Sequence, residues 1–314
     1  GRGGVRSSPG RTAYVMDMAS PHNLPGLDYR EQASRLPFRA GGNVPFIIDA
    51  HTHIHGTQAA ALYRDVARMF GVGLTYSMTR IDMVDQVRGV LGETVRFIAM
   101  PHFAHENKAE AFGPLFIEHI TRLHAEHGCR MVKLWNAPRL RELITGPDAA
   151  DHVQIDGKWR VKVCEHASNL GMMIMAHVAD PDTWFATKYK NPATYGLKLD
   201  HYRGLRVMLK RFTQPWILAH MGGSPESLVF LDELLSEHDN LHLDCSATKW
   251  IVRELSKHPR EQTLAFFLKW RRRVLFGTDI VTNDEQLITK NANVVRMSVM
   301  SDLADSPESA AELY

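Results

Sequence analysis

Residues 45–56 read Pro-Phe-Ile-Ile-Asp-Ala-His-Thr-His-Ile-His-Gly, an apolar run that ends in two closely spaced histidines, His51 and His53. A short run of this kind is typical of a strand that is buried on both faces. Side chains alternate along a strand, so the two imidazoles leave the backbone on the same side, about 7 Å apart. Neutral imidazole is a preferred ligand of zinc and similar divalent metals. The stretch therefore predicts either a pair of metal ligands or two ordinary polar residues, and the rest of the chain decides between them.

The size and charge of the chain limit its class. It has 314 residues, of which 44% are hydrophobic, which is enough for one large α/β barrel or for two ordinary domains. The formal net charge is +2, from 37 basic and 35 acidic residues. A balance this even gives no overall field that would attract nucleic acid or an anionic membrane. We therefore expect neither of these as a partner.

The cysteines and the apolar runs indicate where the protein works. Three cysteines, Cys129, Cys164 and Cys245, are present, and none belongs to a Cys-x-x-Cys pair. This spacing favours neither a disulfide framework nor a cysteine zinc site, and it is typical of a reducing compartment. No apolar run approaches the ~18 residues of a membrane helix, and no charged-then-apolar signal opens the sequence. The expected location is the cytoplasm.

Short apolar runs alternate with helical patterns from residue 44 onward. Residues 1–43 are rich in Gly, Pro, Ser and Arg and are predicted to be an N-terminal extension, whereas 44–314 are predicted to form a single catalytic domain. The expected strands start with the run at 45–50 and continue at 74–78, 96–100, 131–135, 172–176, 215–219, 241–245 and 274–277. Eight strand-then-helix units predict a closed parallel (β/α)8 TIM barrel.

Local signals predict how the later helices begin. Ser224 followed by Pro225 is typical of a helix N-cap and first turn. Thr282-x-x-Glu285 matches a capping box for the last helix. The seventh helix is expected within 250–270.

Potential ligands and catalytic groups lie at the ends of five predicted strands, the first, fourth, fifth, sixth and eighth. They are, in chain order, His51, His53, Lys133, His177, His220 and Asp279. The last three close the runs Met-Ile-Met-Ala-His, Trp-Ile-Leu-Ala-His and Val-Leu-Phe-Gly-Thr-Asp. Active sites of (β/α)8 barrels lie at the C-terminal edge of the strands, so these side chains are predicted to converge there.

Four motifs, Asp-Ala-His-Thr-His, Met-Ala-His-Val, Leu-Ala-His-Met-Gly-Gly-Ser and Phe-Gly-Thr-Asp, occur in this order between residues 45 and 284. On these motifs the chain resembles the amidohydrolase superfamily of metal-dependent hydrolases, most closely its amidohydrolase-2 branch of aminocarboxymuconate-semialdehyde decarboxylase-like enzymes. The resemblance implies that a divalent metal binds to His51, His53, His177 and Asp279. Zinc is the metal most often found, with manganese or iron as alternatives. His220 would lie next to the metal.

Three residues are predicted to be catalytic: Asp279, His220 and Lys133. A bound metal can lower the pKa of water to about 7, and Asp279 would accept the proton and later protonate the leaving group. His220 would bond to this water or polarise a substrate carbonyl. Lys133 leaves three alternatives open: a carboxylated lysine that bridges two ions, an unmodified lysine that holds a substrate carboxylate, or an amine in solvent. We favour one ion, as is usual in the closest branch.

The expected function is hydrolysis of an ester, lactone or amide bond in a small, carboxylated substrate. A nonoxidative decarboxylase or hydratase, both lyases, with the same metal site is the alternative. A catalytically inactive metal-binding barrel is the second alternative, and the presence of Asp279 argues against it. A homodimer would be in keeping with the family.

Overall fold

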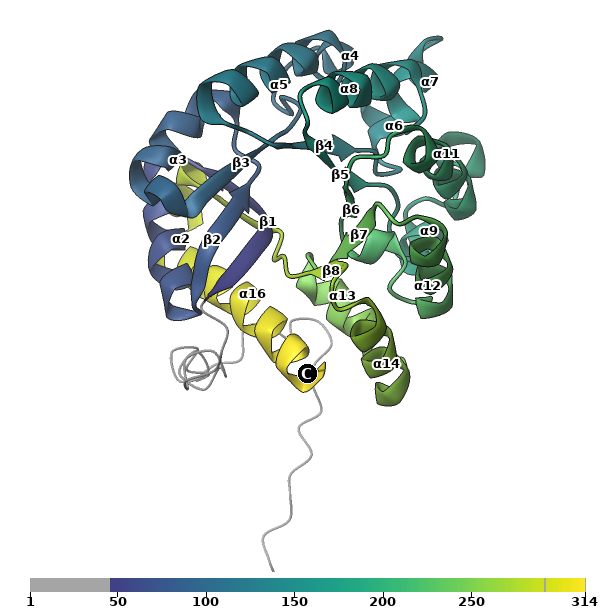
Figure 1. Cartoon of the computed structure of the whole chain (residues 1–314). Coiled ribbons are helices and arrows are strands. Elements are labelled where there is room, and N and C mark those ends of the chain that lie inside the picture. Colours follow the sequence, from purple (N-terminus) through teal and green to yellow (C-terminus); the bar gives the residue numbers. More distant parts are fainter. Residues whose placement is uncertain (1–45, 291, 314) are drawn as a thin grey trace, which may run out of the picture.

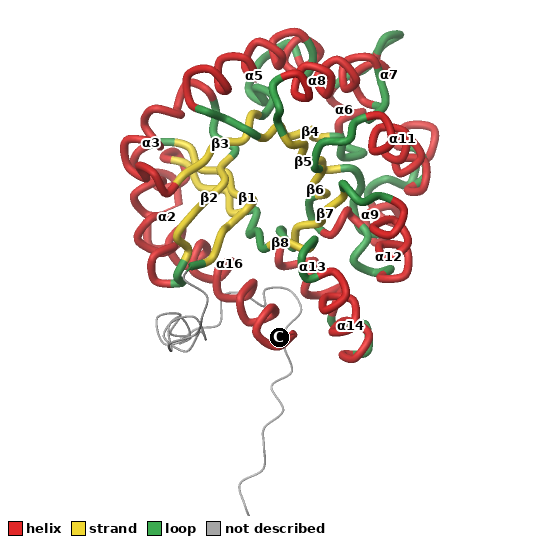
Figure 2. The backbone as a smooth tube through the Cα atoms, viewed as in Figure 1, coloured by secondary structure: helices red, strands yellow, loops and turns green. Residues whose placement is uncertain are grey.

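The strands form a ring that is surrounded by the helices (Figure 1). The structure, a computed structural model, describes residues 46–290 and 292–313, so the predicted extension at 1–43 lies outside the described residues. Seen along the ring, the strands line the inside and the helices form an outer layer (Figure 2). The predicted parallel α/β barrel is confirmed.

Every strand pairing in the described residues is parallel. From β1 to β8, strands that follow one another in the chain are neighbours in the sheet, whereas β9 pairs with β1. The sheet order is β8-β7-β6-β5-β4-β3-β2-β1-β9. The strands span β1 Ile47–His55, β2 Val72–Ser77, β3 Val95–Ala99, β4 Met131–Trp135, β5 Met173–His177, β6 Trp216–Leu218, β7 Leu241–Asp244, β8 Val274–Leu275 and β9 Ile280–Asn283.

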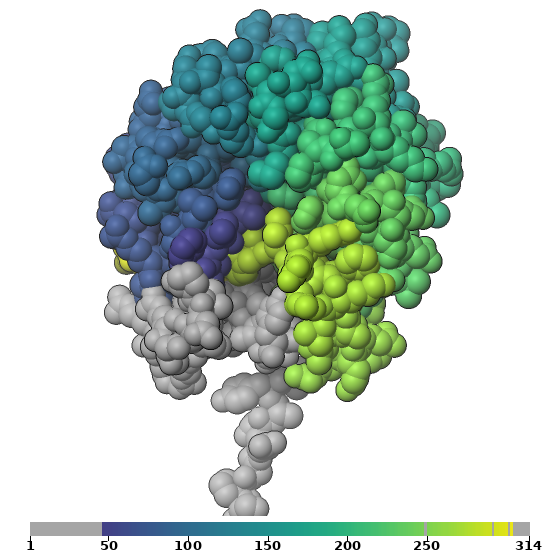
Figure 3. Space-filling view, viewed as in Figure 1, coloured from purple at the N-terminus to yellow at the C-terminus, as the bar shows by residue number. Residues whose placement is uncertain are grey.

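A divided strand closes the ring. β8 pairs with β7 and β9 pairs with β1, and a short irregular segment joins β8 to β9. Within this join the N–H of Ala50 donates to the Phe276 carbonyl at 3.0 Å, and the N–H of Asp279 donates to the His51 carbonyl at 2.7 Å. Residues near position 50 (purple) accordingly lie beside residues near position 280 (yellow-green) in Figure 3. Segment 274–283 thus occupies the place of the eighth strand, between β7 and β1.

The helices connect successive strands on the outside of the ring. None of those in the described ranges is long and apolar enough to span a membrane. They are α2 Thr57–Met69, η1 Ile81–Met83, α3 Val84–Leu91, η2 Gly92–Thr94, α4 Lys108–Ala111, α5 Pro114–His127, α6 Leu140–Leu143, α7 Ala149–Val153, α8 Lys158–Asn169, α9 Asp182–Thr187, α10 Pro192–Tyr195, α11 Lys198–Arg211, η3 Met221–Gly223, α12 Leu228–Glu237, α13 Thr248–Leu255, α14 Arg260–Trp270, α15 Asp284–Lys290 and α16 Ala292–Leu313.

The inside of the barrel changes from apolar to polar along the strands. A small buried cluster fills one level with Met78, Ile98, Met100, Met131, Met175 and Ile217. Lys133 and His177 follow Met131 and Met175 by two residues, so strand alternation keeps them on the same inner face. The residues between them point outward into the larger core that the sheet shares with the helices. The interior therefore supports a polar layer at the C-terminal edge.

The predicted start of α12 at Ser224 is wrong. The chain first makes a 3-10 turn at Met221–Gly223, and α12 begins at Leu228. Its N-cap is Ser227, whose side chain accepts a hydrogen bond from the N–H of Phe230. The tight turn after β6 shifts the cap by three residues because it occupies the segment that would otherwise start the helix.

Two further helix predictions need correction. The capping box lies one residue later than predicted: the Asn283 side chain accepts from the N–H of Gln286, and the Gln286 side chain accepts from the N–H of Asn283. Thr282 is instead a buried residue of β9. The predicted seventh helix is divided into α13 and α14, because Pro259 has the extended conformation of an N-cap.

Candidate functional site

Three predicted metal ligands meet at the C-terminal edge of β1. His51 Nε2 lies 3.2 Å from Asp279 Oδ1, and His53 Nε2 lies 3.3 Å from the same oxygen. The two imidazoles leave β1 on one side, as strand alternation requires, and their ring centroids are 5.7 Å apart. The three ligand atoms all lie within 4.8 Å of one another. A single ion could therefore contact all three.

A buried carboxylate that the sequence reasoning missed, Asp244 at the end of β7, orients His51. Its Oδ2 lies 2.9 Å from His51 Nδ1. When the imidazole is neutral, a proton on Nδ1 leaves Nε2 free to face Asp279 as a ligand. Asp244 Oδ1 also accepts from the backbone N–H groups of His220 and Ser246, at 2.9 and 3.0 Å. This one side chain therefore connects the ends of β1, β6 and β7.

The carboxylates of the site are ionised. Burial raises the pKa of Asp244, but the neighbouring His51, His220 and Lys133 outweigh it and hold that pKa below its usual value. Burial likewise raises the pKa of Asp279, and His220, His51 and His53 outweigh it. Burial and Lys133 lower the pKa of His51, yet the two carboxylates reverse the balance and raise it. Both acids are therefore anionic acceptors at neutral pH.

The predicted catalytic residue His220 is held by Ser246. The Ser246 hydroxyl donates to Asp244 and lies 2.8 Å from His220 Nδ1 and 3.0 Å from His51 Nδ1. Since the hydroxyl hydrogen is used by Asp244, Nδ1 of His220 acts as the donor, and Nε2 of His220 is left unprotonated. Burial lowers the pKa of His220 to about 3, so this ring is neutral. Its centroid is 5.0 Å from that of His51.

Lys133 lies inside the cluster. Its side chain is buried, and Nζ is 3.2 Å from His51 Nε2. Burial lowers its pKa to about 8, although Asp244 and Asp279 act in the opposite direction. The alternative in which this amine points into solvent is therefore wrong. The amine faces the same imidazole nitrogen that would bind a metal.

His177 stands apart from the other predicted ligands. Its ring centroid is 4.8 Å from that of His220, but its Nε2 lies 3.1 Å from Asp180 Oδ1. The hydroxyl of Tyr189 donates to the other oxygen of Asp180 at 2.9 Å. Among the described residues, His177 does not belong to any group of three or more potential metal ligands whose ligand atoms all lie within 4.8 Å of one another. The structure thus brings five of the six predicted residues together. The sixth, His177, lies next to the ring of His220.

Tight turns follow the strands that carry the site. Within 46–290 and 292–313, the non-glycine residues with positive φ are His220, Met221, Ala247 and Asp279, all directly after β6, after β7 or before β9. Asp tolerates this left-handed conformation better than most residues. Strained backbone of this kind persists where the surroundings fix it. Here the N–H of Asp279 is bonded to the His51 carbonyl and that of His220 to Asp244.

The first and last motifs of the sequence hold each other in place. Buried Asp49 accepts hydrogen bonds from the Thr278 hydroxyl at 2.7 Å, the Thr278 N–H at 3.1 Å and the Tyr63 hydroxyl at 3.2 Å. Burial raises the pKa of Asp49 to about 7, against the effect of these bonds from Thr278. At Gly277, a Cβ would lie only 3.0 Å from the Cβ of His51. The Phe-Gly-Thr-Asp turn can therefore pack directly on β1 and bring Asp279 to the two histidines.

The donor set fits a divalent cation. Two imidazole nitrogens and one carboxylate oxygen are the ligand types that zinc and its neighbours take, and a carboxylate behind a metal-binding histidine is a recurrent support. The Asp244 and His51 pair supplies that support. His53, His51 and Asp279 would hold the ion.

Comparisons with known proteins found similar solved structures at low sequence identity. No protein-family model matches the chain, and no curated protein sequence does. Among solved structures, it is similar to 2,6-dihydroxybenzoate decarboxylase complexed with 2,6-dihydroxybenzoate, at 11% identity and a TM-score of 0.48 over 85% of this chain and 100% of that one. It is also similar to Metarhizium anisopliae IDCase in apo form, at 14% identity and a TM-score of 0.45 over 86% and 97%. A third, A. niger ochratoxinase, has 12% identity and a TM-score of 0.42 over 84% and 72%.

Proposed function

We propose that this protein is a metal-dependent hydrolase that cleaves an ester, lactone or amide bond in a small, carboxylated molecule. The observation that carries the proposal is the convergence of His51 Nε2, His53 Nε2 and Asp279 Oδ1 at one point of the barrel's C-terminal edge. That edge is where (β/α)8 enzymes carry their chemistry. The sequence motifs that supply these residues are those on which the chain resembles the amidohydrolase superfamily.

Each polar side chain of the site has its own role in the proposed hydrolysis. When bound, a divalent cation supplies Lewis acidity and makes water more acidic. Asp279 is ionised and accepts the proton of the attacking water at a carboxylate oxygen, then returns it to the leaving group. Neutral His220, which carries its proton on Nδ1, accepts a hydrogen bond at Nε2 and so holds the attacking water in line. Lys133, in its charged form, holds the carboxylate of the substrate.

Lys133 also supports the alternative, a nonoxidative decarboxylase. Its Nζ is 3.2 Å from His51 Nε2, so a substrate carboxylate on Lys133 would lie at the ligand cluster rather than at the far end of the substrate. In a hydrolase Lys133 would hold a carboxylate beside the scissile carbonyl, and in a decarboxylase it would hold the departing carboxylate itself. The same arrangement of side chains could therefore serve either reaction.

The test combines metal analysis with two substrate panels. The purified protein, loaded with zinc or manganese, is expected to retain the ion and to hydrolyse members of a panel of carboxylated esters, lactones and N-acyl amino acids. Release of carbon dioxide from hydroxylated aromatic acids, with no hydrolysis, would instead favour the decarboxylase. A protein that stays metal-free after loading, or that holds metal and turns over neither panel, would contradict both.

Asp279→Asn is the decisive variant. Asn also tolerates the positive φ of position 279, so the turn is kept while the proton acceptor is lost. Turnover is expected to fall by about 10²- to 10⁴-fold. Asp65→Asn is the matched control, because Asp65 is exposed on α2 and hydrogen-bonds to the neighbouring Arg64. Near-normal turnover in Asp279→Asn would remove this residue from the mechanism.

A further inference from the structure

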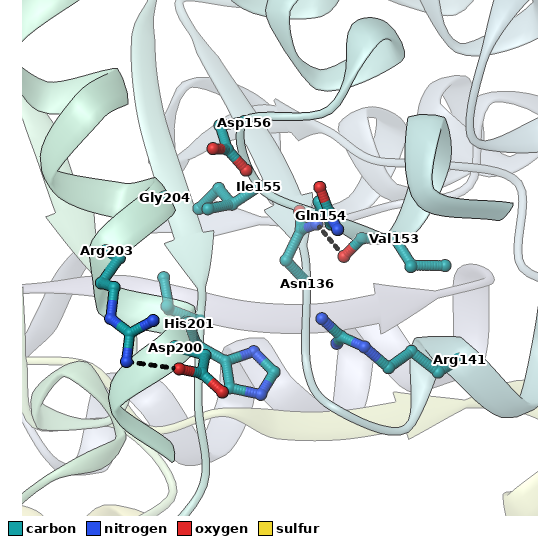
Figure 4. A pocket seen from close by; sticks show the side chains of 11 residues that line it. Asn136, Arg141, Val153, Gln154, Ile155, Asp156, Asp200, His201, Arg203 and Gly204 are labelled. Atoms are coloured by element: carbon teal, nitrogen blue, oxygen red, sulfur yellow. Dashed lines mark hydrogen bonds and ion pairs between the residues drawn. The ribbon is translucent and has the colours of Figure 1, made fainter. Parts of the chain in front are cut away.

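A second cavity lies outside the ligand cluster, between the loops after β4 and β5 and the helix α11. Its volume is about 220 Å³. Asn136, Arg141 and Val178 contribute to the walls from the loop side, and Asp200 and His201 contribute from α11. In Figure 4 the guanidinium of Arg141 reaches across the space towards Asp200 and His201. This cavity has no part in the proposed hydrolysis.

Strand alternation separates this cavity from the candidate active site. Lys133 and Trp135 point to the inside of the barrel, so Asn136, the next residue, points outward. By the same alternation His177 points inward and Val178 outward. The backbone N–H of Asn136 donates to the His177 carbonyl at 2.8 Å, which continues the pairing of β4 and β5 to this level. The cavity therefore lies behind the two strands that carry Lys133 and His177.

Two buried polar atoms in the walls lack a partner. Asn136 is 2% exposed, and its amide nitrogen donates to the Val153 carbonyl at 3.1 Å, but its Oδ1 accepts no hydrogen bond from the described residues. Nη1 of Arg141 is also buried without an acceptor among them. An unsatisfied buried polar group is destabilising, and more so when it is charged. A ligand with both an acceptor and a donor would remove this cost.

The cavity carries charges of both signs. Besides Arg141 it contains Arg203, which is paired with Asp200 at 2.8 Å. Asp156 lies against Gly204 of α11, where a Cβ would be 2.7 Å from its carboxylate oxygen. Two arginines and two aspartates sum to zero formal charge, and burial lowers the pKa of His201 to about 4, so that ring is neutral. A net-neutral ligand with separated charges matches this arrangement.

We propose that this cavity binds a free α-amino acid with a short aliphatic side chain. The carboxylate binds to Arg141, and the ammonium group donates to Asn136 Oδ1 and faces the acids. The side chain packs on the apolar part of the wall, which includes Val153, Ile155 and Val178. At about 220 Å³ the cavity is smaller than the ~300–1,000 Å³ of pockets that bind drug-sized ligands, so the proposed ligand is a small one.

Calorimetric titration of the full chain with three related probes tests the ligand class. L-leucine is expected to bind. Leucinamide, which lacks the carboxylate, and 2-hydroxy-4-methylpentanoate, in which a hydroxyl replaces the ammonium, are each expected to bind at least about 10-fold more weakly. Absence of leucine binding at millimolar concentration would overturn the proposal. Equal binding of the hydroxy acid, or of the amide, would overturn it too.

Variants locate the bound amino acid. Arg141→Met is expected to weaken leucine binding by about 10- to 100-fold, because it removes a charge-assisted hydrogen bond from a partly buried side chain. Arg139→Met is the matched control, since Arg139 lies on the same loop but is exposed and paired with Glu142 outside the cavity. Asp156→Asn is a second variant at an exposed position, so it is expected to fold normally and to bind leucine more weakly. Equal losses in the Arg139 and Arg141 variants, or no loss in either cavity variant, would contradict the assignment.

Discussion

Two histidines of the candidate site, His51 and His177, each hold a buried carboxylate, but the carboxylates come from different distances along the chain. The partner of His51 is Asp244, which is 193 residues away, and the partner of His177 is Asp180, three residues away. Asp244 bonds to groups from three strands, whereas Asp180 bonds within its own loop to His177 and Tyr189. The first pair therefore depends on the assembled barrel, and the second on a local segment.

The largest expected effect is on stability. Asp244→Ala should lower the free energy of unfolding by about 3–5 kcal/mol, because it leaves His51 and several N–H groups buried without their acceptor. Asp180→Ala should cost about 1–3 kcal/mol, because its partners lie in one loop that can adjust. Chemical denaturation of both variants measures the difference. Equal losses of unfolding free energy in the two variants would mean that the two carboxylates contribute equally to stability.

The second expected difference between the His51–Asp244 pair and the His177–Asp180 pair is in metal affinity. Asp244→Asn is expected to weaken zinc binding by about 10- to 100-fold, since the carboxylate that orients His51 is lost. Asp180→Asn is expected to change it less, because Asp180 contacts the Nε2 of His177 and does not support a histidine from behind. Competition with a chelating dye gives both affinities. A larger loss in Asp180→Asn would show that His177 anchors the ion.

The smallest effects come from the two hydroxyl donors. Ser246→Ala and Tyr189→Phe each remove one hydrogen bond to a carboxylate and should each cost about 1–2 kcal/mol of stability. Only Ser246→Ala should also weaken zinc binding, because Ser246 contacts His51 and His220. Denaturation and dye competition on the same samples provide the comparison. Weakened zinc binding in Tyr189→Phe would contradict the division into two independent pairs.

The sequence predicted the histidines because each follows an apolar run at a strand end, where the fold requires side chains to converge. The same signal marks Asp244, which closes Leu-His-Leu-Asp in β7. Asp49 belongs to the Asp-Ala-His-Thr-His motif, but the motif alone does not predict its bonds to Thr278 and Tyr63. An acid inside an apolar run can be recognised as buried, but its partner cannot, because that partner is chosen by tertiary packing.

Other parts of the prediction failed for local reasons. The order of strands and helices follows from periodicity, and the closed barrel follows from their number. The cap at Ser224 was wrong because positive φ at His220 and Met221 extends the turn after β6, and a single sequence does not reveal such backbone strain. The exposure of Lys133 could not be judged either, since strand alternation alone does not tell how deep an inner side chain lies.

The bond between Asp49 and Thr278 spans 229 residues of chain. A ribosome therefore releases His51 and His53 long before the turn that completes their surroundings has been made. Contacts so distant in sequence form slowly, because a large loop must be ordered first. During synthesis the early strands should thus form an open sheet with an unpaired edge until segment 274–283 has been made.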